Sequence, residues 1–163
     1  MPENIITHDR RVYRQCNPDG GDPPFYNPKS GIHHSLFRPG NRDFDGLSFI
    51  RIELRTPIWA AYRIENPEIR FLLINLSCVD LSNAAANLSS QSFVDTPDEM
   101  DNRFGEPWAH CVFAGANLND YKSDPAKTNP IRVWAKKVAA QINQNQISGP
   151  FLSPSDQDSY RPT

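Results

Sequence analysis

The sequence predicts an α+β fold with a single mixed sheet of about four or five strands, on which a short helix and a C-terminal amphipathic helix pack. Three patterns support this prediction. Residues 47–54 alternate apolar and polar side chains, residues 69–76 are apolar on both alternating sets, and residues 131–142 repeat apolar positions at helical spacing. These patterns indicate a half-buried strand, a central strand covered on both faces, and a helix that docks on the sheet.

Shorter signals indicate the remaining elements. We expect a first strand at residues 10–16, an extended segment at 32–37 and a further apolar strand at 108–113. Thr56 before Pro57 predicts the start of a short helix that extends through Tyr62, and Asn129 before Pro130 predicts the start of the last helix. The segments between these elements are rich in Gly, Pro, Asn and Asp, which is typical of loops.

The length of 163 residues is that of one domain. We expect a single globular domain at residues 1–145 and a disordered tail at 146–163, where Phe151 and Leu152 form a candidate docking motif. Residues 82–107 lose the strand pattern and gather acidic side chains, so this segment is the best candidate for a mobile excursion or lid.

Charge and cysteine content disfavour several classes of protein. A net charge of −2 provides no global basic field for nucleic-acid binding, and the chain has no DNA-binding motif. The three cysteines have no paired spacing, which argues against a disulfide framework and a CxxC metal site. There is no signal-peptide pattern and no apolar run of about 18 residues. We therefore expect a cytoplasmic protein that does not bind membranes.

Histidines and arginines form the first candidate site. Neighbours on a strand point to opposite faces, so at most one of His33 and His34 can share a face with His110. We consider His34 and His110 as acid and base at a phosphodiester, with anion contacts from Arg11, Arg14 and Arg38. The alternative is that each histidine is a hydrogen-bonded side chain on a strand face.

Other chemistries have weaker support. A metal site of His33 or His34 with His110, Cys111 and Asp43 or Asp45 is disfavoured, because His110 and Cys111 point to opposite faces of one strand. Cys16 beside Arg14 is a candidate nucleophile, although a lone cysteine more often fills packing volume. The glycines lack the helix and lysine of a phosphate-binding loop, and the sequence identifies no cofactor.

Arg14 on an early strand and Ser48 on a later strand resemble the layout of ADP-ribosyltransferase-like domains. This resemblance implies a nicotinamide dinucleotide held by Arg14 and Ser48, and it requires a later glutamate. No glutamate stands in the expected third position, so Glu99 and Glu106 are candidates by elimination.

A second resemblance is to small bacterial proteins of unassigned function, and it extends over roughly residues 10–140. It is based on the order of four short motifs: Tyr13-Arg14-Gln15, Phe37-Arg38-Pro39, Leu47-Ser48-Phe49 and Pro107-Trp108-Ala109-His110. This resemblance implies one domain and no particular activity.

Two functional hypotheses follow. The first is a protein-interaction module of a larger bacterial assembly or of a defence or toxin system, with a protein partner bound by proline-rich loops, by exposed aromatics such as Phe25 and Tyr26, or by the tail. The second is a toxin-type enzyme that acts on a nucleotide or RNA phosphate. The sequence slightly favours the first. The test is whether one cleft contains Arg14, His34, Ser48 and His110.

Overall fold

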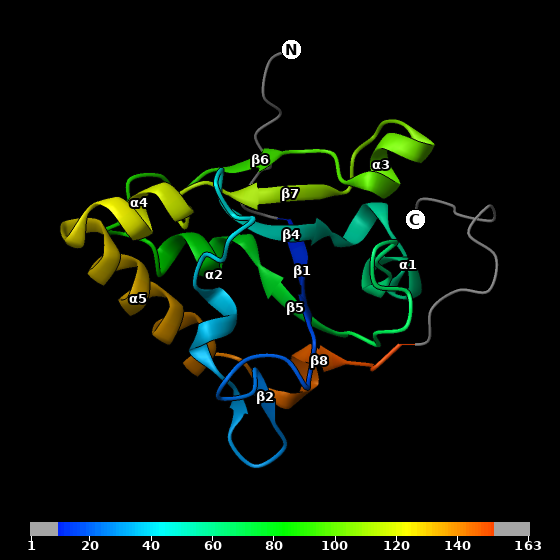
Figure 1. The fold of residues 1–163 in the computed structure, drawn as a ribbon, viewed down its shortest axis with the longest axis horizontal. Helices are drawn as coiled ribbons and strands as arrows, with labels where there is room; N and C mark the ends of the chain where they lie inside the picture. Colours follow the sequence, from blue (N-terminus) through cyan, green and yellow to red (C-terminus); the bar gives the residue numbers. More distant parts are fainter. Residues whose placement is uncertain (1–9, 152–163) are drawn as a thin grey trace.

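The computed structural model describes residues 10–151. Its main sheet has six strands in the order β6-β7-β4-β1-β5-β8 (Figure 1). These strands are β1 (Arg11–Cys16), β4 (Leu47–Arg51), β5 (Leu72–Ser77), β6 (Phe93–Asp95), β7 (His110–Phe113) and β8 (Ile147–Ser148). A separate hairpin pairs β2 (Tyr26–Asn27) with β3 (Gly31–Ile32). The α+β prediction is confirmed, and there are more strands than expected.

All strand pairings described in the two sheets are antiparallel, whereas we expected a sheet of mixed direction. The reason is the position of β1. β4 and β5 run in the same direction, but β1 lies between them and is antiparallel to both. The helical connection from β4 to β5 therefore crosses over a strand instead of joining two parallel neighbours.

Helices cover both faces of the main sheet (Figure 1). On one face, α2 (Cys78–Asn83) and α5 (Pro125–Ala140) bury Leu81 and Trp134 against strand residues such as Phe49. On the other face, α1 (Pro57–Ala61) packs against Ile50 and Leu73. α3 (Glu99–Phe104) lies beside α1, and α4 (Leu118–Ser123) precedes α5. The prediction of a central strand covered on both faces is confirmed.

The expected strand at residues 32–37 is wrong. Only Gly31–Ile32 is extended, and His34–Phe37 forms a short 3₁₀ helix, η1. The turn begins because the His33 Nδ1 accepts a hydrogen bond from the Ser35 backbone N–H at 3.1 Å. Burial of Leu36 and Phe37 stabilises this turn, and η1 packs against α5. The strand alternation that we applied to the two histidines therefore does not hold there.

Three other boundaries differ from the predictions. β4 stops at Arg51 and continues as a 3₁₀ turn, η2 (Ile52–Leu54), while α1 ends at Ala61. α5 begins at Pro125, because Asp124 accepts a hydrogen bond from the Ala126 N–H at 2.9 Å and caps the helix. The Asn-Pro signal that we used lies inside this helix. Two cap signals compete in this segment, and the earlier one starts the helix.

Residues 82–107 are not an excursion from the fold. β6 pairs with β7, and α3 begins with a capping box in which Asp98 and Asp101 exchange hydrogen bonds. Phe93 and Met100 are buried. This segment therefore supplies an edge strand and an anchored helix.

Our prediction starts the disordered tail at residue 146, which is too early. β8 pairs with β5, and the Phe151 N–H donates to the Phe71 carbonyl at 3.2 Å, so the chain packs on the domain as far as residue 151. Leu152 and the rest of the expected tail lie outside the described residues. Within residues 10–151, no helix is long and apolar enough to cross a membrane.

Candidate functional site

A cleft of about 1150 Å³ opens where β1 and β4 separate. β1 pairs with β5 along its whole length, but its pairing with β4 consists of Val12↔Arg51 and Tyr13↔Ile50. The cleft is lined by the diverging parts of β1 and β4, by His110 of β7, and by residues 38–43, 62–66 and the start of α3. Its volume is slightly above the ~300–1,000 Å³ usual for small-molecule sites.

Arg14 bridges the two strands where their backbone pairing stops. Its Nη1 donates to the Ser48 carbonyl at 2.9 Å, and its Nη2 and Nε donate to the Leu36 carbonyl at 2.8 and 3.2 Å. The guanidinium also lies over the Phe49 ring, 5.9 Å from its centroid. Three donors and a ring therefore hold Arg14 in one orientation at the lining of the cleft.

The charge of Arg14 is not neutralised by a neighbouring acid. Among residues 10–151, no carboxylate lies within ion-pair distance of its guanidinium. Burial lowers the pKa of Arg14, and the more distant charge of Asp43 opposes that shift. Arginine stays protonated in proteins, so a positive charge stands in a partly desolvated position with only neutral oxygens around it. An anion that enters the cleft would complete this environment.

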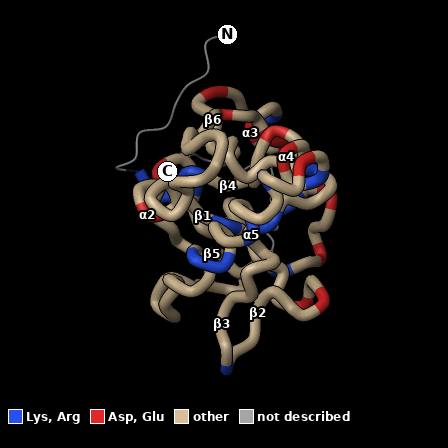
Figure 2. The backbone as a smooth tube through the Cα atoms, turned by 90° about the vertical axis from the view of Figure 1, so that its left-hand side faces the viewer, with Lys and Arg blue, Asp and Glu red and all other residues tan. Residues whose placement is uncertain are grey.

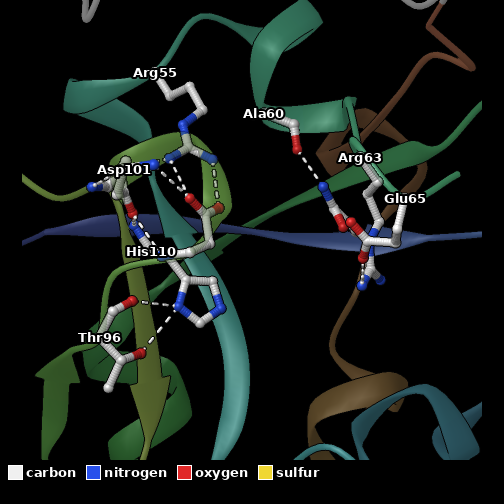
Figure 3. Close-up of polar contacts among 10 residues, drawn as sticks. Arg55, Ala60, Arg63, Glu65, Thr96, Asp101 and His110 are labelled. Atoms are coloured by element: carbon white, nitrogen blue, oxygen red, sulfur yellow. Dashed lines mark hydrogen bonds and ion pairs between the residues drawn. The ribbon is translucent and has the colours of Figure 1, made fainter. Parts of the chain in front are cut away.

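His110 has a defined tautomer. Its Nδ1 lies 2.6 Å from the Thr96 carbonyl oxygen and 2.9 Å from the Thr96 hydroxyl (Figure 3). A carbonyl oxygen can only accept, so Nδ1 carries the proton and donates it. Nε2 is left as the acceptor, with no hydrogen-bond partner among the described residues. His110 can therefore act as a general base through Nε2, while the hydrogen bond of Nδ1 to Thr96 fixes the orientation of the ring.

A buried ionic network holds the His110 backbone in place (Figure 3). Arg55 and Asp101 are each 1% exposed, and the Arg55 Nη2 donates to the Asp101 Oδ1 at 2.6 Å. Asp101 also accepts from the backbone N–H groups of Ala109 and His110, both at 2.9 Å. The start of β7 is therefore tied to α3 by one carboxylate.

Asp98 joins this network to the cleft. Arg55 donates to its two oxygens at 2.8 and 3.2 Å, and Asp98 lines the cleft. Burial alone would raise the pKa of the Asp98 carboxyl, but the hydrogen bond and charge of Arg55 outweigh burial and lower it. Asp98 is therefore ionised at neutral pH.

The opposite wall holds a second set of charges. The Glu65 Oε1 accepts from the Arg63 Nε at 2.9 Å and pairs with the Arg42 Nη1 at 3.5 Å (Figure 3 shows Arg63 and Glu65). Arg42 and Glu65 come from different loops, so this ion pair joins two segments that line the cleft. Arg63 also lies over the Phe71 ring, 6.0 Å from its centroid. These cations differ from Arg14 because they already have a carboxylate partner.

The structure brings together part of the predicted site. Arg14, Arg38, Ser48 and His110 line the same cleft, as does Glu99. His34 does not line it: its ring packs on His33, with centroids 4.2 Å apart, in η1 beside α5. Neither Arg11 nor Glu106 lines it, and the Arg11 Nε donates to the Asn75 side chain at 2.6 Å. The paired histidines expected at one site are thus separated by the 3₁₀ turn.

The cysteines are packing residues in this fold. Cys16, Cys78 and Cys111 are buried and are not in disulfide bonds. Burial raises the pKa of Cys16 to about 11 against the opposing charge of Arg14, so the thiol is protonated at neutral pH and is a poor nucleophile. Among residues 10–151, no cluster of three or more His, Cys, Asp or Glu side chains has a geometry that could hold a metal ion.

Sequence reasoning missed several lining residues, including Asp98, Glu65 and Arg63. Arg63 and Glu65 lie in a loop without periodicity, and no local signal marks them. Asp98 had one usable signal, since an aspartate three residues before Asp101 is a capping-box pattern. Comparisons with known proteins found no matching family model, curated protein or solved structure.

Proposed function

We propose that the chain is an enzyme that acts on a nucleotide substrate, and that the cleft between β1 and β4 is its active site. One observation supports this most strongly: Arg14 lines the cleft, held by backbone carbonyls, with no carboxylate partner among the described residues. Buried charges in proteins are normally paired, so this guanidinium favours a ligand that supplies the anion. A phosphate group has the charge and geometry for that role.

The chemistry we propose is proton abstraction by His110. The Nε2 lone pair takes the proton of an attacking hydroxyl as its oxygen bonds to the electrophilic centre, and the bond to the leaving group breaks with its electron pair. The leaving group then takes a proton from water, and protonated His110 gives its proton to the hydroxide that remains, which restores the base. Arg14 compensates the negative charge that develops on the phosphate. The fixed Nδ1–H bond to Thr96 keeps the accepting nitrogen in place.

Aromatic side chains support a nucleotide over a simple phosphate ester. Tyr13, Phe25 and Tyr121 are half-buried and line the cleft. Such rings stack on nucleobases, and each stacked base contributes about 1–3 kcal/mol in single-strand binding proteins. A ligand with a planar base and an adjacent phosphate would use the rings and Arg14 together.

A nicotinamide dinucleotide is one candidate ligand for this cleft. Arg14, Ser48 and Glu99, which the resemblance to ADP-ribosyltransferase-like domains selects, line the same cleft. The interaction-module hypothesis has less support. Phe25 and Tyr26, which we expected to be exposed, are half-buried against the core. Among residues 10–151, the large apolar side chains that are exposed, Phe44, Ile58, Val79 and Val133, lie on different segments.

The binding test compares two arginines of the same strand. Calorimetry with AMP, ADP, a nicotinamide dinucleotide and a short oligoribonucleotide is expected to find at least one ligand for the wild type. Arg14→Gln should weaken its binding about 10- to 100-fold, the equivalent of a charge-assisted hydrogen bond of about 1.5–3 kcal/mol. Arg11→Gln, on β1 but outside the cleft, should leave binding unchanged.

Two results would contradict this proposal. One is that no member of the panel binds the wild type. The other is that Arg11→Gln weakens binding as much as Arg14→Gln does. Arg14→Lys serves as a second variant, because it keeps the charge and loses the planar fork; it should bind between wild type and Arg14→Gln.

A further inference from the structure

Positive charge continues out of the cleft onto α5. Arg38 and Tyr121 both line the cleft, and Arg38 directly follows η1, whose Leu36 carbonyl is held by Arg14. The Tyr121 hydroxyl accepts from the Arg132 Nε of α5 at 3.3 Å, and the Arg132 guanidinium lies 5.8 Å from the centre of the Tyr121 ring. The cleft and α5 thus meet at Tyr121.

Two further observations extend this contact. Burial alone would raise the pKa of Tyr121, but the hydrogen bond from Arg132 and the positive charges of Arg38 and Arg132 lower it, so both arginines lie near this side chain. α5 packs against η1, and burial and the charges of His33, Arg38 and Lys136 lower the pKa of His34 in η1, so Lys136 and Arg38 both lie near His34. We call Arg38, Arg132 and Lys136 the basic tract.

The basic tract has no acidic partner among residues 10–151. No carboxylate lies within ion-pair distance of Arg38, Arg132 or Lys136. The Arg38 Nε and the His34 Nδ1 are buried without a hydrogen-bond partner within that range. By contrast, Arg42 on the opposite side of the cleft pairs with Glu65. The positive charges of the basic tract, like that of Arg14, therefore have no carboxylate partner among the described residues.

The tract is also spaced for a chain of phosphates. Arg132 and Lys136 are exposed and stand one turn apart on α5, a rise of about 6 Å. Figure 2 looks onto α5 and shows its Lys and Arg positions in blue. Together with Arg38 at the cleft, they form a line of cations that leads from the proposed active site onto the outer surface.

We propose that the substrate is a single-stranded nucleic acid whose backbone follows the basic tract while one nucleotide occupies the cleft. This inference rests on the proposed function and specifies its substrate class. Successive phosphates need successive cations, which a mononucleotide would leave unused. Unpaired bases can stack on the half-buried aromatic rings of the cleft, whereas paired bases within a duplex cannot.

Fluorescence anisotropy with labelled single strands of two, five and ten nucleotides tests this inference, in parallel RNA and DNA series. Wild-type affinity should rise with length and fall with salt. Arg132→Gln/Lys136→Gln should lower affinity for the decamer at least tenfold and reduce the slope of log K against log salt by about 1.4, because each lost phosphate contact contributes about 0.7. Its affinity for a mononucleotide should remain within twofold of wild type.

Control variants separate the possible failures. Lys29→Gln/Arg70→Gln removes the same charge from outside the cleft and should bind the decamer like wild type. Equal decamer affinity for the wild type and the tract variant, or affinity independent of length, would overturn the tract while leaving the proposed function intact. Equal binding of a duplex would overturn the single-strand assignment. If no nucleotide of any length binds, the proposed function fails as well. The RNA and DNA series show which sugar the site accepts.

Discussion

Asp101→Ala is expected to lower the free energy of unfolding by about 3–5 kcal/mol, the cost of breaking a buried ion pair. Asp101 is 1% exposed, and it accepts hydrogen bonds from Arg55 and from the backbone N–H groups of Ala109 and His110. Its removal takes the acceptor from three backbone N–H groups, those of Asp98, Ala109 and His110, and removes one of the carboxylates that pair with Arg55. Urea unfolding followed by circular dichroism measures the loss.

The matched control is an exposed aspartate without an ion pair. Asp19→Ala should change stability by less than about 0.5 kcal/mol, as surface substitutions usually do. A loss below about 1.5 kcal/mol for Asp101→Ala would contradict the importance of this network, because even the unpaired donors alone should cost that much. The network would then not be what holds α3 on β7.

His110→Gln is expected to lower the turnover of the substrate found by the binding test about 10²- to 10⁴-fold, the usual contribution of a general base. Glutamine keeps a polar side chain of similar reach but offers no nitrogen that accepts a proton. KM should change little, because the phosphate contact of Arg14 is retained. Steady-state kinetics on the purified variants measure both constants.

Two variants control for this result. His34→Gln changes a histidine that does not line the cleft and does not cap η1, so it should leave turnover unchanged. Thr96→Val removes the hydroxyl but keeps the carbonyl that accepts the Nδ1 proton at 2.6 Å, so turnover should fall by less than about tenfold. Turnover in His110→Gln equal to that of wild type would remove His110 from the mechanism.

Much of the fold was predictable because its main elements have strong periodicity. β1, β4, β5, β7 and α5 all arise where the apolar pattern indicates a strand or a helix. The errors occur where a local hydrogen bond overrides the pattern. The His33 side chain turns residues 34–37 into a 3₁₀ helix, and Asp124 starts α5 before the Asn129-Pro130 signal that we used. Competition between caps cannot be resolved from one sequence.

The site was less predictable because it depends on where two strands part. Arg14, Ser48 and His110 were selected by residue type, and they line one cleft where β1 and β4 stop pairing after Tyr13↔Ile50. Nothing in the sequence marks that point. The network of Arg55 and Asp101 could not be predicted either, since the two residues are 46 positions apart and Asp101 lies in a segment that we expected to be a mobile acidic loop.

The most direct test of the central claim is an experimental structure of the wild-type chain with the nucleotide that binds most tightly in the calorimetric panel. We predict a phosphate oxygen at about 2.7–3.0 Å from the Arg14 guanidinium and the His110 Nε2 facing the bond that reacts. A nucleotide bound anywhere other than the cleft between β1 and β4, with the cleft empty, would contradict the account.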